Sequence, residues 1–261
     1  MHIWFTDLDN TLIYSYKHEI PLPKTTAEYY QDREQSYLTE RTRQFCTAFC
    51  RQPDQWFVPL TTRIQSQYER ILLREWLPYR YALIHNGAVL LDHGVPDETW
   101  LRESLTMAAD CAAPLMAALA DLHTIAEEAH VHDVRPYMVY AVSEQVTPAF
   151  VETLRQCYEP QGLSVMHSGR KLYCLPQVFS KGNAVRRFCE RFAARTDTVI
   201  ASGDSVFDLS MLAESDLALY PQTLTVPAVK GRRFPISGFF ADGLCTVLEQ
   251  ELQNAPENNC K

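Results

Sequence analysis

The chain has 261 residues, of which 46% are hydrophobic and 21% charged, and it carries a net charge of −8 at pH 7. This length suffices for one large domain or two modest ones with a buried core. The negative charge argues against a nucleic-acid backbone or an anionic membrane surface as the main partner.

The cysteines and the start of the chain predict a cytoplasmic protein. Eight cysteines are scattered without a Cys-x-x-Cys pair, which favours free thiols in a reducing compartment. Met1 leads directly into a strand-like segment, and we expect no membrane-spanning segment.

Apolar runs and amphipathic segments alternate over the first 87 residues. The runs predict strands over 2–6, 56–60 and 81–84, and apolar side chains at helical spacing predict helices over 39–51 and 64–75. Such alternation is typical of an α/β fold with a Rossmann-like, doubly wound parallel sheet, which we predict for the core.

Residues 13–39 interrupt this alternation. They are polar, rich in tyrosine and contain two prolines, so we expect a long excursion over the surface near the first loop. Such an excursion could help to cover a site.

The pattern changes between residues 88 and 170. The predicted elements are a helix-rich piece over 100–128, strands over 137–142, 163–167 and 171–175, and a helix over 148–157. Residues 168–170 are typical of a hairpin turn. We therefore predict an inserted α+β cap domain over 88–170, within a catalytic core formed by 1–87 and 171–261.

The alternation of helices and strands then resumes. We predict helices over 182–195 and 208–214, a strand over 198–201, and a last helix that begins at Asp242. The polar tail over 254–261 is expected to be frayed.

Two aspartates stand directly after the first predicted strand. Side chains alternate along a strand, so Asp7 and Asp9 should point the same way while Leu8 points into the protein. One carboxylate can attack phosphorus, the other can transfer protons, and a divalent cation can bind between them. The alternative is a surface turn in which Thr11 caps a helix.

Two further loops at strand ends carry polar residues, and ligands of parallel sheets bind at that edge. Thr61 could donate a hydrogen bond to a phosphate oxygen, with Arg63 close by, although a threonine at this position more often caps a helix. Lys181 is predicted at a helix start, where the macrodipole disfavours a cation. A solvated surface lysine is the alternative there.

The last polar loop carries two carboxylates after the strand over 198–201. Asp204 and Asp208, together with Asp7, offer the hard oxygen ligands that Mg²⁺ prefers. Asp208 could also cap a helix, and that role does not exclude the first.

These four loops resemble, in order and spacing, the four motifs of the haloacid dehalogenase (HAD) superfamily of phosphohydrolases. The motifs are matched, in order, by residues 7–11, Thr61, Lys181 and 203–208. The Thr-Thr-Arg sequence at 61–63, Asn-Gly-Ala at 86–88 and the cap-sized block resemble the type IIB branch, which has a C2-type cap and includes the Cof-like sugar phosphatases and sucrose-phosphate phosphatase.

The resemblance implies a Mg²⁺-dependent phosphatase that hydrolyses a small phosphorylated metabolite, such as a sugar phosphate, through a phosphoaspartate intermediate. Asp7 would be the nucleophile, Asp9 the acid and base, and Thr61 and Lys181 the residues that hold the phosphoryl oxygens. The implied metal ligands are Asp7, the backbone carbonyl of Asp9, Asp204 and, directly or through water, Asp208.

Two positions depart from the family pattern. Thr62 stands where glycine is common, and Phe207 stands where Cof-like members usually carry asparagine. Loss of that asparagine removes a hydrogen-bonding group near the phosphate, so it bears on substrate geometry rather than on the reaction class.

Specificity in this branch lies in the cap. The candidates to bind a sugar, a carboxylate or a second phosphate are Arg135, Tyr137, His167, Arg170 and Lys171, joined in the core by Arg63 and Asn86. For each, an ordinary surface or packing role is the alternative. We do not expect a metal cluster at His130, His132 and Asp133, because no matching partners stand nearby.

Two other functions are compatible with the same residues. A phosphomutase of this fold would return the phosphoryl group to the same sugar instead of releasing phosphate. A catalytically silent HAD-like binding or regulatory protein would need neither metal nor nucleophile, and the intact acidic set argues against it. The predicted partner is a small phosphate ester, and the sequence predicts no oligomeric state.

Overall fold

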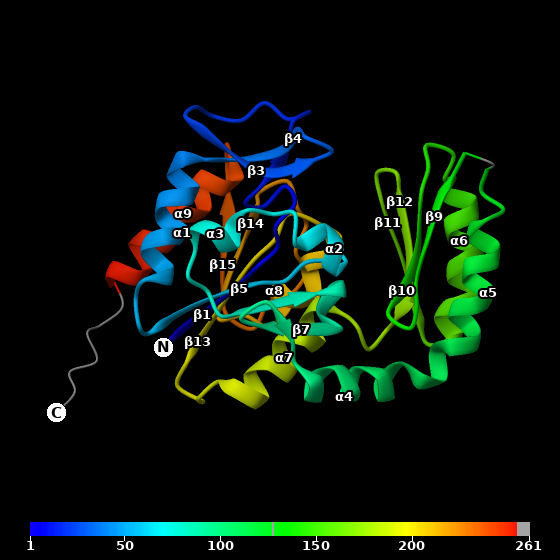
Figure 1. Cartoon of the computed structure of the whole chain (residues 1–261). Helices are drawn as coiled ribbons and strands as arrows, with labels where there is room; N and C mark the ends of the chain where they lie inside the picture. The colour runs from blue at the N-terminus through cyan, green and yellow to red at the C-terminus, as the bar shows by residue number, and fades with distance from the viewer. Residues whose placement is uncertain (127, 255–261) are drawn as a thin grey trace.

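The structure, a computed structural model, describes residues 1–126 and 128–254. It has two lobes, with a larger α/β lobe on the left of Figure 1 and a smaller lobe, built from a sheet and two helices, on the right. Helix α4 (Glu98–Ala108) runs between them along the bottom of that view. Of the tail predicted over 254–261, Asn254 is the last residue of α9 (Phe240–Asn254), and 255–261 lie outside the described residues.

The core sheet has five parallel strands in the order β15-β14-β13-β1-β5. Their bounds are His2–Thr6 for β1, Gln55–Pro59 for β5, Thr198–Ser202 for β13, Leu217–Pro221 for β14 and Arg232–Ile236 for β15. The central strand β1 places its carboxyl end between those of β5 and β13. The predicted doubly wound parallel sheet is thus confirmed.

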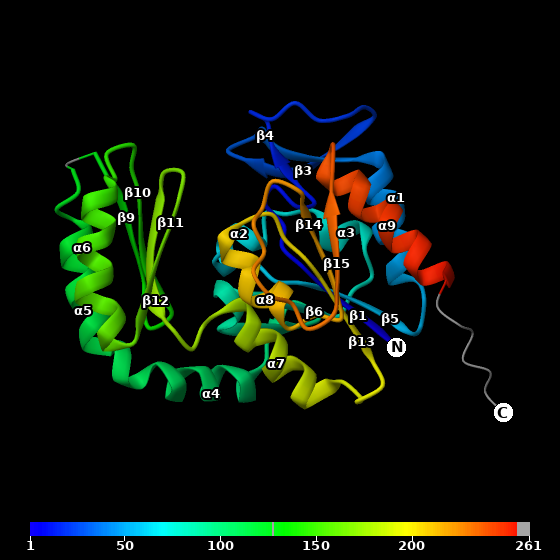
Figure 2. The ribbon, with the colours of Figure 1, turned by 180° about the vertical axis from the view of Figure 1, so that it is seen from behind.

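Both faces of this sheet are covered because β1 is apolar on both sides. Trp4 packs on one face against Phe45 and Phe49 of α1 (Glu40–Cys50), beside α9 (Phe240–Asn254). Phe5 packs on the other face against Phe188 of α7 (Lys181–Phe192), next to α8 (Leu209–Ala213), and Figure 2 shows this second pair of helices. A strand that is buried on both faces has a continuous apolar sequence, because side chains on both sides face the interior.

Residues 13–39, for which the sequence predicted an excursion and no strands, form a small antiparallel sheet. Its strands β2 (Tyr14–Ser15), β3 (Lys24–Tyr30) and β4 (Arg33–Thr39) lie in the order β2-β4-β3. Gln31 and Asp32 join β3 to β4 with φ of 50° and 59°, as a two-residue hairpin turn requires. The turn lacks the glycine that usually marks it in a sequence. We call this sheet the insertion sheet.

The helix predicted over 64–75 is two short helices, α2 (Gln65–Tyr68) and α3 (Leu73–Trp76). The insertion sheet interrupts it, because the Leu72 N–H donates to the carbonyl of Ala27 in β3 at 2.8 Å. A backbone donor used in this way cannot extend a helix.

The predicted strand over 81–84 exists but lies outside the parallel sheet. This strand, β6 (Tyr81–Ile84), pairs antiparallel with β7 (Val89–Asp92), which in turn pairs with β8 (Val95–Pro96). A single parallel bridge, between Leu60 and Leu83, links it to the end of β5. 

The smaller lobe holds a four-stranded antiparallel sheet in the order β11-β12-β10-β9, with α5 and α6 packed on one face. Its elements are α5 (Ala112–Leu122), β9 (His130–Val134), β10 (Met138–Val142), α6 (Pro148–Tyr158), β11 (Leu163–Ser168) and β12 (Lys171–Pro176). The predicted hairpin between β11 and β12 is confirmed, with Ser168 opposite Lys171 and Gly169 at a φ of 55°.

The structure suggests other boundaries for the cap than the 88 and 170 proposed from the sequence. A boundary at 170 would cut the β11-β12 hairpin, and Trp100 of α4 is buried in the apolar cluster of the core. We therefore propose that the cap runs from about 109 to 176, with α4 on the core side. The helical piece predicted over 100–128 divides there, because a 3₁₀ turn at Ala109–Cys111 separates α4 from α5.

The same helical stretch bears on the expectation about membranes. Among the described residues, Glu98–Leu122 is long and apolar enough to cross a membrane by length and composition, with a mean hydropathy of 1.4. Core helices of soluble proteins pass the same test. Here the stretch is two helices whose side chains at Trp100, Leu115 and Leu122 are buried in protein.

Candidate active site

The first loop positions Asp7 at the carboxyl end of the central strand. The Asp7 N–H donates to the carbonyl of Ser202 at 2.9 Å, which continues the pairing of β1 with β13 past the strand end. The Leu8 carbonyl accepts from the N–H groups of Thr11, Leu12 and Ile13, and this tight turn buries the Leu8 side chain, as predicted.

Lys181 lies between two carboxylates. Its Nζ donates to Asp7 Oδ1 and to Asp208 Oδ1, both at 2.6 Å, and the side chain is only 1% exposed. Burial acts to lower the pKa of Lys181, but the two carboxylates outweigh it and hold the pKa above its usual value. The lysine is therefore charged and directed at Asp7, and the alternative of a solvated surface lysine is excluded.

The loop over 203–208 is organised by Asp208. Its Oδ2 accepts from the Asp204 N–H at 3.1 Å, the Ser205 N–H at 3.0 Å and the Ser205 hydroxyl at 2.9 Å. Gly203 is required beside it, since a Cβ at that position would come within 2.3 Å of Asp208 Cβ. Asp204 is held separately, because the Thr11 hydroxyl donates to its Oδ1 at 3.2 Å.

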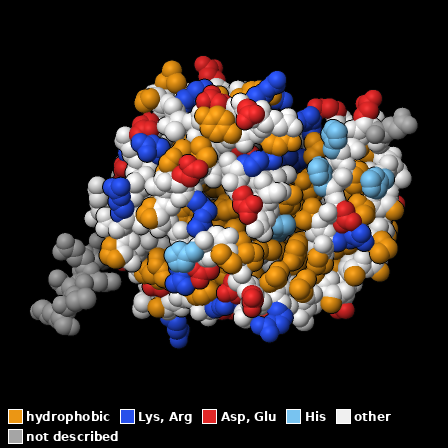
Figure 3. Space-filling view, in the orientation of Figure 1, with side chains coloured by type: hydrophobic (Ala, Val, Ile, Leu, Met, Phe, Trp, Pro, Cys, Tyr) orange, Lys and Arg blue, Asp and Glu red, His pale blue; other side chains and the backbone are white. Residues whose placement is uncertain are grey.

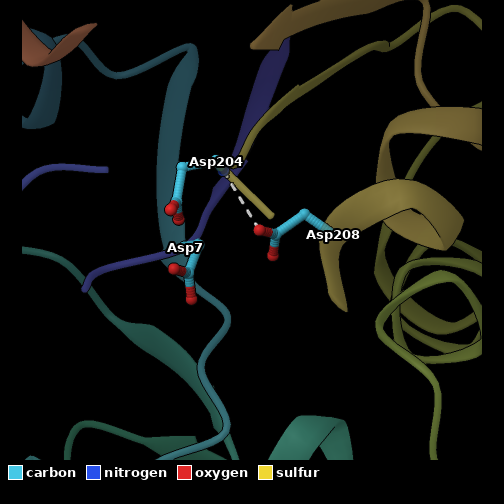
Figure 4. A group of neighbouring side chains, drawn as sticks. All are labelled: Asp7, Asp204 and Asp208. Atoms are coloured by element: carbon cyan, nitrogen blue, oxygen red, sulfur yellow. Dashed lines mark hydrogen bonds between the residues drawn. The ribbon is translucent and has the colours of Figure 1, made fainter. Parts of the chain in front are cut away.

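Three carboxylates lie close together, as Figure 4 shows. Oxygens of Asp7, Asp204 and Asp208 all lie within 4.8 Å of one another. Burial raises the pKa of Asp7 well above its usual value. Burial, and after it the charge of Asp208, raises the pKa of Asp204 to about 7. Such crowded anions fit a divalent cation, which prefers hard oxygen ligands and would offset their repulsion. Asp7 and Asp204 have oxygens to offer, whereas both oxygens of Asp208 already accept hydrogen bonds.

The side chain of Asp9 is held by an arginine. Arg63 donates Nε to Asp9 Oδ2 at 2.8 Å and Nη2 to Asp9 Oδ1 at 2.7 Å, a bidentate pair. Burial acts to raise the pKa of Asp9, but Arg63 outweighs it and keeps the pKa below its usual value. Arg63, predicted as a substrate residue, therefore contacts the acid/base candidate.

A buried glutamate of the insertion sheet anchors this arginine. Glu28 is 1% exposed, and it accepts from Arg63 Nη2 at 2.9 Å and from Arg70 Nε at 3.0 Å. A buried carboxylate needs such partners, because an unpaired charge in the interior is costly. We expected the segment over 13–39 only to cover a site, and the side chain that it sends into the site was not predicted from the sequence.

Replacing Glu28 with glutamine is expected to lower kcat roughly ten- to a hundredfold, because a neutral amide holds two arginines weakly and misplacement of Arg63 would misplace Asp9. Steady-state kinetics over a range of pH would measure it, and a shift of the pH profile distinguishes misplacement of Asp9 from simple loss of folded protein. Glu34→Gln, an exposed change on the same sheet, is the matched control. Equal kinetics for the two variants would contradict the role of Glu28.

Thr61 and Asn86 occupy inner positions next to the site. Thr61 is 1% exposed, and its hydroxyl oxygen accepts from the Arg63 N–H at 3.2 Å. The role of Thr61 in binding phosphate remains a prediction. The catalytic pocket is lined by its neighbour Thr62. Asn86 is 2% exposed and its Nδ2 donates to the carbonyl of Phe179, two residues before Lys181. This contact indicates a packing role for Asn86, with its part in substrate binding still a prediction.

The structure separates the cap candidates into two groups. Arg170 and Lys171, at the β11-β12 turn, line the catalytic pocket, whose volume is about 440 Å³. Arg135 is outside that lining and pairs with its neighbour Asp133 at 2.6 Å. Tyr137 and His167 lie outside it as well, and Tyr137 packs edge-on against His85, with ring centroids 5.2 Å apart.

His132 and Asp133 of the cap have other contacts. His132 stacks on Tyr140 at 4.3 Å between ring centroids, and Asp133 is used by Arg135. Within residues 1–126 and 128–254, the group that could hold a metal ion is Asp7, Asp204 and Asp208.

Several lining residues were not predicted from the sequence, among them His18, Tyr173 and Ser205. His18 comes from the insertion sheet's first connection and carries no motif that would mark it. Tyr173 of the cap meets Phe207 edge-on, with ring centroids 5.5 Å apart. Phe207, the departure from the family pattern, is thus a contact between the core loop and the cap.

The parallel sheet, the inserted antiparallel lobe and the four convergent loops define a phosphoric monoester hydrolase of the HAD superfamily, type IIB, as the motifs predicted. A family model described as sucrose-6F-phosphate phosphohydrolase matches residues 1–219, and the chain belongs to this family. Among curated proteins, none matches the chain by sequence at a significant level.

Solved structures share the fold at low sequence identity. The sucrose-phosphatase from Synechocystis sp. PCC6803, in complex with sucrose and phosphate, is 15% identical with a TM-score of 0.70, over 95% of this chain and 97% of that one. The trehalose-6-phosphate phosphatase of Aspergillus fumigatus is 14% identical with a TM-score of 0.56, over 96% and 93%. A HAD phosphatase from Bacteroides thetaiotaomicron is 12% identical with a TM-score of 0.57, over 96% and 94%.

Proposed function

We propose that the protein is a Mg²⁺-dependent phosphatase that hydrolyses a small phosphorylated metabolite, such as a sugar phosphate, through a phosphoaspartate on Asp7. The observation that carries the proposal is the buried Lys181, which donates to Asp7 at 2.6 Å while Asp204 and Asp208 converge on the same carboxylate. A dianionic ester cannot approach a carboxylate without cations to offset the repulsion. We expect the protein to act in the cytoplasm.

In the first step, an Asp7 oxygen would attack phosphorus and the ester oxygen would leave. Lys181 would offset charge on the transferring oxygens, and Asp9 would give its proton to the departing alkoxide. Pairing with Arg63 favours ionised Asp9, whereas the approach of the dianionic ester favours the protonated form that this step needs.

In the second step, water would attack the phosphorus of the phosphoaspartate, and Asp9 would take the proton from that water. The Asp7–phosphorus bond breaks, which releases inorganic phosphate and restores both carboxyl groups. Asp7 and Asp204, supported by Asp208, would hold Mg²⁺, which supplies further positive charge beside the phosphoryl group when it is bound.

A small sugar phosphate is favoured by the family and by its neighbours. The Synechocystis sucrose-phosphatase binds sucrose and phosphate, and the pocket of this chain, at about 440 Å³, is of a size for one small molecule.

Phosphate release from a panel of phosphorylated metabolites tests the proposal. With Mg²⁺ we expect free phosphate from at least one ester, and with EDTA we expect the rate to fall by roughly a hundredfold or more, because two anions would then face each other without the cation. Transfer of the phosphoryl group back to the same sugar would identify a phosphomutase instead. No turnover on any ester with Mg²⁺ would favour a catalytically silent binding protein.

A further inference from the structure

A second cavity opens beside the catalytic pocket. Its volume is about 520 Å³, and the two cavities share Asp9, Asn10, His18, Arg170 and Lys171. It lies between the insertion sheet and the β11-β12 turn of the cap, so that both lobes contribute to its lining. Figure 3 shows the surface hollowed between the two lobes, with Lys and Arg side chains at the upper part of this hollow.

The position of Asp9 tells which part of a substrate this second cavity would receive. Asp9 lines both cavities, while Lys181 and Asp204 line only the first. In the proposed reaction, Asp9 transfers a proton to the leaving alcohol, so the alcohol part of the ester must lie on the side of Asp9 away from the phosphoryl group. The second cavity is therefore the leaving-group side of the site.

This cavity has more positive than negative side chains. Its acidic residues are Asp9 and Glu28, and both are already paired with Arg63, with Arg70 as a second partner of Glu28. Their charge is thus compensated within the protein.

Three further cations line the cavity beyond those pairs. Lys17 comes from the connection between β2 and β3, and Arg170 and Lys171 come from the cap. Among the described residues, no carboxylate forms an ion pair with Lys17 or Lys171, and Arg170 meets Glu144 at 3.4 Å between two exposed side chains. An exposed pair of this kind contributes little and exchanges readily for another anion.

We propose that this second cavity binds an anionic group, a carboxylate or a second phosphate, on the alcohol part of the substrate. The inference rests on the proposed phosphatase function and narrows its substrate class from phosphate esters in general to esters with two anionic groups. An ester whose alcohol part is an uncharged sugar would leave these cations without an anionic partner. Guanidinium and ammonium groups form strong charge-assisted hydrogen bonds with carboxylate and phosphate oxygens.

Matched pairs of esters test the inference by steady-state kinetics with Mg²⁺. Glycerol 3-phosphate and 3-phosphoglycerate differ by a carboxylate on the alcohol part. Fructose 6-phosphate and fructose 1,6-bisphosphate differ by a second phosphate. In sucrose 6F-phosphate the alcohol part is an uncharged disaccharide. In at least one pair, we expect the ester with the second anionic group to have a kcat/KM roughly tenfold or more above that of the ester without it, as one charge-assisted hydrogen bond provides. The pair that responds identifies the anion.

The double variant Arg170→Gln/Lys171→Gln should reduce that preference about tenfold by raising KM for the anionic ester more than for its match. Arg102→Gln removes one exposed charge from α4, outside both cavities, and is the control. The inference would be overturned, while the phosphatase function stands, if the enzyme prefers esters whose alcohol part is uncharged. It would also be overturned if the double variant keeps the full preference for esters with a second anionic group. No phosphate release from any ester would instead overturn the function on which it rests.

Discussion

Asp7→Asn is expected to lower kcat at least about a thousandfold, because an amide oxygen is a far weaker nucleophile than a carboxylate and cannot form the phosphoaspartate. The fold should persist. Asparagine keeps the volume of the side chain and removes one of three crowded carboxylates, and Lys181 retains its 2.6 Å contact with Asp208. Phosphate release and thermal unfolding would be measured on the same preparation.

The matched control is Asp133→Asn, which removes a cap carboxylate that pairs with Arg135 outside the catalytic pocket. Its kcat should stay within about twofold of the unmodified protein, since changes away from the site have small effects. Turnover by Asp7→Asn at the level of this control would remove Asp7 as the nucleophile.

Lys181→Met is expected to lower both turnover and stability. Two buried carboxylates would lose their shared cation, and breaking a buried pair costs about 3–5 kcal/mol, which corresponds to a fall in Tm of roughly 10 °C in a protein of this size. kcat should fall by a hundredfold or more, on the order of the loss when one group that offsets transition-state charge is removed. Thermal unfolding with EDTA would measure the stability, and phosphate release with Mg²⁺ the turnover.

The double variant Lys181→Met/Asp208→Asn separates the two effects. It removes one of the two stranded charges, so Tm should recover in part, while turnover should stay low because the cation at the phosphoryl group is still missing. An unchanged Tm in Lys181→Met would mean that the buried pairs contribute little to folding. Full recovery of turnover in the double variant would contradict a phosphate-binding role for Lys181.

The catalytic loops were predictable because each follows a short apolar strand. The runs before Asp7 and Thr61 became β1 and β5, and the run before Asp204 became β13. Parallel strands bring their carboxyl ends to one edge, so residues far apart in the chain meet there. The prediction required only the local pattern of strand followed by polar loop.

Some of the strands that were not predicted have a weak local pattern. The edge strand β15 carries two arginines and a proline, and β9 alternates histidine, valine and aspartate, so neither shows an apolar run. The strands of the insertion sheet were not predicted, because they are polar and their hairpin turn lacks glycine. Edge and surface strands are held by backbone pairing with a neighbour, which a single segment does not reveal.

The sequence by itself determined the class of chemistry, since Asp7, Asp9, Lys181 and Asp204 are motif residues whose meeting follows from the topology of a parallel sheet. Only the tertiary structure decided what surrounds Asp9. Arg63 stands 54 positions from Asp9 and 35 from Glu28, and nothing local links the three. Ion pairs depend on distance in space and on burial, and the packing of the insertion sheet against the core sets both.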